Sequence, residues 1–386
     1  MLKAQVGSSI AADARQAGRE AAEKASRGLN GSVALVYGSA VYDAEEFLSG
    51  VREGLGGVPF LGCSSFTGVL TPEGFVGGAD GFAGVMAIED PSMTVGVASG
   101  ERGECPRKAG HSVAEAALRN SGRTDDPDWF YMVAPPGEEE SYLAGIQEVV
   151  GRIPFFGGSA ADNDLTGKWH VYGQKAMPSG VAVAFFWNKP FGNRYTGAYR
   201  PTGKRGIITK VDSKRVLREI DGKPALEVVA GWLGSSPDTL MGANLLFRTI
   251  TNPLGQRDLV DAKHVWIRHP MGGNPDMSIN VGNNLVEGCS VELMEATVDE
   301  LVGSVGDAVG VCRERLAGDP GALIAVHCGG RRGGIGDRIG EVSEQLKKSA
   351  GGLPYIGVFT FGEYGFEKGS ANGCGGLMLS FMLLGK

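Results

Sequence analysis

Features that would place this chain in several large classes of protein are absent from its 386 residues. It contains no run of about 18 apolar residues, so we expect no membrane-spanning helix. Its basic residues form no stripe and its formal net charge is −7, which argues against a nucleic-acid partner. No apolar core of a signal peptide follows Lys3, and the Ala-rich stretch from Ser8 to Arg27 instead predicts an amphipathic helix. We therefore expect a cytoplasmic protein.

The six cysteines lack the spacing of a metal site or of a disulfide framework. No Cys-x-x-Cys pair occurs, so a structural zinc ion is not expected. The acidic run Asp162–Asp164 is not followed by EF-hand spacing and predicts a turn rather than a calcium site. The chain has no P-loop and no clear Gly-x-Gly-x-x-Gly motif. We therefore expect reduced thiols, no metal and no cofactor.

Glycine, in contrast, is abundant. The 63 glycines are about one residue in six, well above the usual ~7%. They are not periodic, which excludes collagen, and they gather at the ends of apolar runs and in loops. The remaining composition, 42% hydrophobic and 21% charged, is that of a globular protein with room for two or three domains.

One short pattern occurs three times: apolar, Pro, aromatic, apolar, Gly, small. The copies are Val58–Cys63, Ile153–Gly158 and Leu353–Val358, and hydroxyl residues follow each of them. A strand that ends in glycine brings backbone N–H groups close to whatever lies at that end. Three such strand ends predict a duplicated fold with a pocket at the loops.

Each copy closes a longer unit that begins with a continuous apolar run and continues with a helix. Such runs are typical of fully buried strands in a parallel sheet. We therefore predict an α/β fold in which duplicated βαβ units form mixed sheets, with two domains around a shared cleft. The runs are Val33–Gly38, Trp129–Ala134 and Ala322–Cys328, and the helices are Asp43–Leu55, Glu138–Val150 and Ile339–Ala350.

Further elements lie between the units. Polar Arg200–Gly206 predicts a linker, Val298–Leu316 an amphipathic helix, and Gly376–Leu384 a buried strand. Residues 240–296 are rich in strand patterns. More strands are expected at Gly81–Glu89, Met93–Gly100, Trp169–Met177 and Gly180–Trp187.

Nearly the whole chain, from about Val33, resembles proteins with a FIST N-terminal and a FIST C-terminal domain in tandem. The resemblance implies a FIST N-terminal domain at 1–203 with two internal repeats, and a FIST C-terminal domain at 204–386 with the third repeat at 322–366. The segments that carry it are Gly62–Ser65, Gly157–Ala160, Arg200–Lys204, Glu219–Glu227, Cys328–Arg331 and Thr360–Glu363.

The resemblance further implies an intracellular sensory module that binds a small ligand such as an amino acid. Members of the family are often fused to signalling output domains, which this chain does not contain, so a signalling partner protein is expected and a homo-oligomer is compatible. The predicted ligand-binding residues are Gly62, Cys63, Ser64, Ser65, Gly157, Gly158, Ser159, Cys328, Arg331, Thr360, Gly362 and Glu363.

The Gly-rich loop Cys328–Arg338 adds a candidate anion site, where Arg331 could form a bidentate pair with a carboxylate. Glu363 could hold a ligand amine, so the two side chains together would suit a zwitterion. The alternatives without a ligand are that Arg331 is a solvated arginine in a surface loop and that Glu363 forms a salt bridge with a local arginine.

Two other functions remain open from the sequence. An enzyme acting on a small carbonyl or amide compound in the interdomain pocket would use Cys63 or Cys328 as nucleophile and Glu363 as acid or base. Each cysteine could equally be an inert buried residue. His327 is adjacent to Cys328 on the predicted strand and faces the other way, which argues against a dyad. The third alternative is a protein-interaction adaptor with a vestigial pocket.

Overall fold

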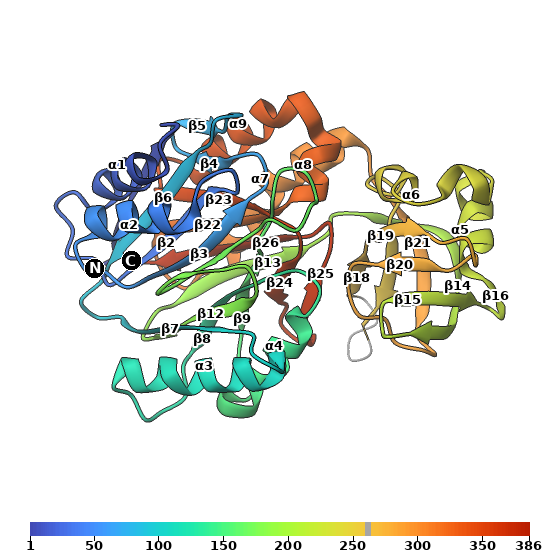
Figure 1. Cartoon of the computed structure of the whole chain (residues 1–386), viewed down its shortest axis with the longest axis horizontal. Helices are drawn as coiled ribbons and strands as arrows, with labels where there is room; N and C mark the ends of the chain where they lie inside the picture. Colours follow the sequence, from blue (N-terminus) through green and yellow to red (C-terminus); the bar gives the residue numbers. More distant parts are fainter. Residues whose placement is uncertain (259–263) are drawn as a thin grey trace.

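A computed structural model describes residues 1–258 and 264–386. The chain folds into a large body of sheets and helices and a smaller body, here called the small body, formed by residues 200–295. Figure 1 shows the small body on the right, beside the large one.

The large body contains three sheets with the same order of strands. In each sheet a parallel pair from one βαβ unit lies between antiparallel neighbours. The first sheet runs β1 (Lys3–Ser9), β6 (Ala83–Glu89), β2 (Val33–Ser39), β3 (Phe60–Ser65), β10 (Val171–Tyr172) and β11 (Ala176–Met177). The second runs β7 (Thr94–Glu101), β12 (Gly180–Trp187), β8 (Trp129–Ala134), β9 (Phe155–Ser159), β24 (Glu363–Phe366) and β25 (Asn372–Gly375). The third runs β13 (Phe191–Thr196), β26 (Leu379–Gly385), β22 (Pro320–Cys328), β23 (Tyr355–Thr360), β4 (Val69–Thr71) and β5 (Gly74–Val76).

Each repeat contributes its last hairpin to the sheet of another repeat. Hairpin β4–β5 of the first repeat pairs with β23 of the third, β10–β11 of the second pairs with β3 of the first, and β24–β25 of the third pairs with β9 of the second. This cyclic exchange joins the three repeats into one body, so none of the three sheets is built from a single repeat.

The glycine of the threefold pattern has a role in this pairing. A Cβ atom added to Gly62 would lie 1.7 Å from the carbonyl oxygen of Val36 on the parallel neighbour. One added to Gly157 would lie 1.9 Å from the carbonyl oxygen of Met132, and the φ of Gly157 is +131°. A side chain at either position would therefore push the βαβ unit apart.

Helices cover the outer face of each sheet, and the inner faces share a core in which the hydroxyls of Tyr37 and Tyr131 form a 2.7 Å hydrogen bond. The covering helices are α1 (Ala14–Ser26) and α2 (Ala44–Leu55), α3 (Pro106–Ser121) and α4 (Glu139–Val150), and α7 (Val298–Arg315) and α9 (Ile339–Ala350). Side chains cap the N-termini of several of these helices. Asp13 at the start of α1 accepts a hydrogen bond from the N–H of Gln16, and Thr297 and Glu300 form a capping box at the start of α7.

The small body is inserted into the third repeat, between β13 and α7. The sheet of the small body packs around a hydrophobic core of its own. This core is separate from the inner core of the large body and from the three cores beneath the helices of the large body. The elements of the small body are β14 (Arg200–Asp212), β15 (Val216–Ile220), β16 (Lys223–Pro224), α5 (Ala225–Leu233), the 3₁₀ helix η1 (Pro237–Leu240), α6 (Asn244–Arg248), β17 (Leu254–Arg257), β18 (Val265–Arg268), β19 (Pro270–Gly273), β20 (Ile279–Val281) and β21 (Ser290–Glu295).

The mixed α/β fold with repeated βαβ units is confirmed by the three parallel strand pairs. Three local predictions were wrong. Residues 200–206 are the start of β14 rather than a linker, because they pair with β21. The helix predicted from Ser8 begins only at Ala14, because Ser8 and Ser9 belong to β1 and pair with β6. The domain boundary predicted at residue 203 lies inside β14, and the division of the chain into domains stays a prediction.

The third wrong prediction concerns the Gly-rich loop. It is the short helix α8 (Gly329–Ile335) followed by the 3₁₀ helix η2 (Gly336–Arg338). Its glycines allow close packing, since a Cβ on Gly330 would lie 2.8 Å from Leu377 and one on Gly334 would lie 2.4 Å from Ile250. Among the described residues, no helix is long and apolar enough to cross a membrane.

Candidate functional site

The carboxyl ends of the parallel strands of all three repeats meet in the large body. The Ser65 hydroxyl accepts a 3.0 Å hydrogen bond from the N–H of Phe359, which joins the first repeat to the third. The N–H of Ser159 donates to the carbonyl of Gly362 at 2.7 Å, and that of Ala161 donates to the carbonyl of Ser64 at 2.9 Å. Ligands of α/β proteins bind at such strand ends.

Glu363 places a buried carboxyl group at this meeting point. One carboxyl oxygen accepts from the Thr360 hydroxyl at 2.8 Å and the other from the N–H of Met378 at 2.9 Å. Burial raises the pKa of Glu363 to about 8, although these bonds and one from the Cys328 thiol favour the ionised form. Glu363 is therefore largely protonated at neutral pH.

The Cys328 thiol lies between Glu363 and the start of α8. Its sulfur accepts from the N–H of Gly330 at 3.2 Å. Burial and the nearby Glu363 raise the pKa of Cys328 well above that of a free thiol. Cys63 lies in the inner core beside Tyr37 and Tyr131, and burial raises its pKa as well. Neither thiol is ionised at neutral pH in this arrangement, and their catalytic roles stay predictions.

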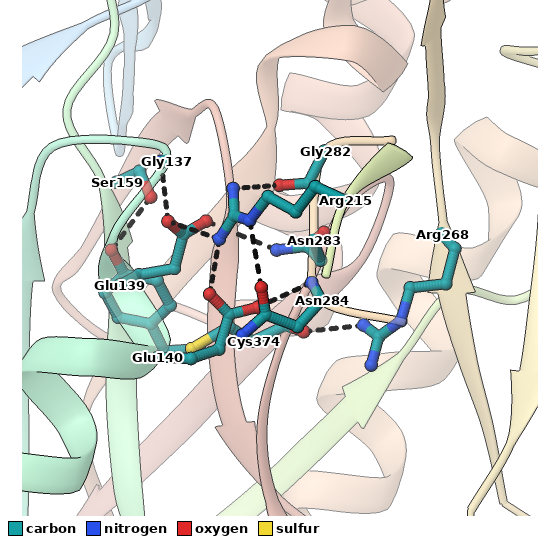
Figure 2. Close-up of polar contacts among 11 residues, drawn as sticks. Gly137, Glu139, Glu140, Ser159, Arg215, Arg268, Gly282, Asn283, Asn284 and Cys374 are labelled. Carbon is teal, nitrogen blue, oxygen red and sulfur yellow. Dashed lines mark hydrogen bonds and ion pairs between the residues drawn. The ribbon is translucent and has the colours of Figure 1, made fainter. Parts of the chain in front are cut away.

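A second buried carboxyl group, Glu139, lies at the start of α4. It accepts from the N–H of Gly137 at 2.6 Å, from Arg215 at 3.0 Å and from the Asn283 amide at 3.2 Å, as Figure 2 shows. Burial and the neighbouring Glu140 raise the pKa of Glu139, and Arg215 opposes them. Glu139 and Arg215 thus connect the large body with the small one.

Glu139 borders the strand-end residues. A Cβ on Gly362 would lie 3.4 Å from a Glu139 carboxyl oxygen and 2.8 Å from the Ser159 hydroxyl. That hydroxyl also forms a 2.8 Å hydrogen bond with the hydroxyl of Tyr364. Glu139 therefore lies next to Gly362, the residue before Glu363 in the chain.

Arg215 ties the small body to α4 through several bonds. It donates to the carbonyl of Gly282 at 2.6 Å and to the Asn284 side chain at 3.1 Å within the small body. Across the boundary it contacts both Glu139 and Glu140. Glu140 also accepts from the N–H of Asn284 at 3.0 Å.

The Gly-rich segment Asn372–Gly376 forms the other side of this boundary. A Cβ on Gly373 would lie 2.4 Å from the Trp266 ring, and one on Gly376 would lie 3.2 Å from the Cβ of His269. The N–H of Gly376 donates to the carbonyl of Ile267. Glycine is needed here because β25 and the turn after it lie directly against β18 and His269.

Arg331 is fully buried and points toward α7. It donates to the carbonyl of Leu301 at 3.0 Å, to the Ser304 hydroxyl at 2.6 Å and to the carbonyl of Gly197, and it lies 5.8 Å from the Tyr199 ring centre. Among the described residues it forms no ion pair with Glu363. A pocket shared by these two side chains stays a prediction.

The strand ends bring together most of the residues predicted from the sequence. Sequence reasoning missed Glu139, Arg215 and Asn283, although the acidic run 138–140 directly after a buried strand is a signal for the first of them. The converging residues are Ser64, Ser65, Gly157, Gly158, Ser159, Cys328, Thr360, Gly362 and Glu363. Gly62 lies one pairing position further along β3, opposite Tyr172.

Within the described ranges, no three His, Cys, Asp or Glu residues are grouped so that they could hold a metal ion. The segment that begins at Asp162 is a turn, as predicted, because the Asp162 carboxylate accepts from the N–H groups of Leu165, Gly167 and Lys168.

Comparison with known proteins gives two family matches. Residues 32–223 match the model of the FIST N domain and residues 225–365 that of the FIST C domain. No protein with a curated description shows significant similarity to the chain.

Solved structures show only distant likeness. A cyanuric acid hydrolase from A. caulinodans is 10% identical with a TM-score of 0.33, and both chains are covered completely. A second cyanuric acid hydrolase structure is 12% identical with a TM-score of 0.30, covering 99% of each chain. PurLQS from Thermotoga maritima is 10% identical with a TM-score of 0.23, covering all of this chain and 72% of the other. Likeness at this level carries no conclusion about activity.

Proposed function

The chain belongs to the family of proteins with a FIST N and a FIST C domain, and from this membership we propose that it is a sensory protein that binds a small anionic or zwitterionic metabolite, such as an amino acid. The proposed site lies where the strand ends of the large body meet the small body. It includes Ser159, Thr360, Gly362 and Glu363, with Glu139 beside them.

The observation that carries the proposal is the burial of Glu139 and Glu363 at this boundary. Both carboxyl groups are removed from water and have raised pKa values, and carboxyl groups perturbed in this way are concentrated at functional sites. A ligand ammonium group next to Glu363 would favour its ionised form and release its proton. Proton release on binding is therefore a specific expectation of a cationic ligand group at Glu363.

The signal would pass through the small body. Arg215 and the contact between β25 and β18 join it to the site, so a ligand that binds better to one arrangement of the two bodies shifts the population toward it. A partner protein would then recognise the favoured arrangement.

An enzyme is the second candidate, because the structure places the Cys328 thiol in contact with Glu363 and with the N–H of Gly330. In that case Glu363 in its ionised form would take the thiol proton, and the N–H of Gly330 would stabilise the negative charge on the sulfur. The raised pKa of Cys328 makes binding without turnover the better supported function.

Native mass spectrometry of freshly purified protein, followed by denaturation and identification of the released compound, tests the proposal. An unaltered metabolite in stoichiometric amount supports binding, and a covalent adduct on Cys328 supports the enzyme. Titration of the identified compound in buffers of different ionisation enthalpy then measures the protons released. Glu363→Gln should abolish that release, and release that persists in the variant would contradict a cationic group at Glu363.

A further inference from the structure

Arg268 ends strand β18 of the small body and faces β25 across the boundary. Only 8% of the residue is exposed. Among the described residues, its guanidinium makes one hydrogen bond, from Nη1 to the carbonyl of Cys374 at 2.7 Å, and this is the only dashed line that reaches the guanidinium in Figure 2.

The opposite edge of the guanidinium has no protein partner. Its Nε atom is buried and finds no acceptor in the described part of the chain. No carboxylate there forms an ion pair with Arg268. Glu140, whose negative charge acts on Arg268, is already bound by Arg215 and by the N–H of Asn284.

A buried cation with so few partners is costly, and arginine satisfies its donors most efficiently with an anion. The edge formed by Nε and Nη2 presents two parallel N–H groups, which match the two oxygens of a carboxylate. The bond from Nη1 to Cys374 holds the guanidinium plane, so this edge is already oriented.

We propose that Arg268 is the anchor for the carboxylate of the ligand, bound side-on through Nε and Nη2 on the edge of the guanidinium that faces away from β25. This inference rests on the proposed function and names the anion-binding residue of the same site.

The charges around the boundary favour a singly charged anion. Glu139 and Glu140 lie within the same group of contacts and would repel a phosphate dianion more strongly than a carboxylate. The ligand class that fits is a small monocarboxylate, with an ammonium group as the complement to the buried acids.

The test compares wild type with Arg268→Gln and Arg268→Lys. The probes are glycine, L-alanine, L-aspartate, L-glutamate, pyruvate, succinate and inorganic phosphate, each titrated calorimetrically and by thermal shift. Arg218→Gln is the matched control, because Arg218 also belongs to the small body but pairs with Asp212 and Asp276 at its surface. A carboxylate probe should bind the Gln variant about 10- to 100-fold more weakly than wild type, and the Lys variant to an intermediate degree. The control should bind as wild type does.

Three results would overturn the inference. If a carboxylate binds wild type and Arg268→Gln equally, Arg268 is not the anchor, while the proposed binding function stands. If no carboxylate probe binds wild type, the inference and the proposed function fail together. Arg268→Met distinguishes a structural role of Arg268 from a role in ligand binding. Without ligand this variant should unfold at a temperature close to that of wild type, because an apolar side chain replaces a buried cation that has no ion-pair partner in the described part of the chain. A large loss of thermal stability in this variant, combined with unchanged binding, would assign Arg268 to the fold instead.

Discussion

Replacing Glu363 by glutamine should remove a pH dependence of stability from the protein. In the unfolded chain this carboxyl group ionises near 4.5, and in the folded protein it does so at about 8. Between these values the unfolded chain has lost a proton that the folded protein keeps. The contribution of Glu363 is therefore most favourable below pH 4.5 and is lost as the pH rises toward 8.

The magnitude follows from the separation of the two pKa values. At about 1.4 kcal/mol per pH unit, the roughly 3.5 units correspond to about 5 kcal/mol as an upper bound. Glutamine can form a hydrogen bond with both partners of Glu363, because its oxygen can accept from the N–H of Met378 and its NH2 group can donate to the Thr360 hydroxyl oxygen, which reverses the direction of that bond. We therefore expect the variant to match wild type within about 1 kcal/mol near pH 5 and to be several kcal/mol more stable near pH 8.

Urea unfolding of both proteins from about pH 5 to pH 9 measures the effect. The difference between the two unfolding free energies isolates Glu363, since the other titrating groups contribute to both proteins. Parallel pH profiles would refute the reasoning, because they would mean that Glu363 ionises in the folded protein as it does in the unfolded chain.

Three further predictions follow from the contacts. In urea unfolding, Gly62→Ala and Gly157→Ala should each lower the free energy of unfolding by about 3 kcal/mol or more, because the new Cβ meets the carbonyl of a neighbouring strand. The control is Gly303→Ala on α7, where the new Cβ has open space, and this change should be neutral or stabilising. Arg215→Met should leave Glu139 without its buried counter-charge and so accelerate amide exchange in residues 282–284 and in the first turn of α4. Hydrogen–deuterium exchange mass spectrometry measures this, and unchanged exchange in these segments would show that Arg215 does not join the two bodies. Iodoacetamide at neutral pH should label Cys105 first, because the N–H groups of Lys108 and Arg107 at the start of α3 lower its pKa. Cys63 and Cys328 should stay unlabelled until the protein unfolds, and fast labelling of either thiol would contradict its burial.

Local patterns predicted the repeated units well. The run Gly180–Trp187 and the helix Ile339–Ala350 have in the structure the bounds that the sequence indicated. Apolar periodicity and helix caps depend on residues a few positions apart, so they can be read from a short window. The sequence failed at 200–206 and 329–335, where pairing with β21 and packing against Ile250 and Leu377 overrode the local composition.

The candidate site was predicted in part for the same reason. Hydroxyl residues at the repeated strand ends could be recognised because the parallel strands of βαβ units end at one edge. The direction in which a side chain points could not be predicted from the sequence. Arg331 was expected beside Glu363, yet its guanidinium binds carbonyl groups near α7. Arg268 is buried, although no pattern in the sequence around it indicates this.

The sequence by itself determined the secondary structure of the repeats, their number and the residues at their strand ends, because hydrophobic period and turn chemistry act over a few residues. Only the tertiary structure decided that each repeat gives its last hairpin to another sheet and that buried charges from both bodies meet. Arg215 and Glu139 are 76 residues apart in the chain, and Arg268 and Cys374 are 106 apart. Contacts at such separations arise only when the whole chain closes on itself, since no local pattern specifies which distant strand will lie alongside.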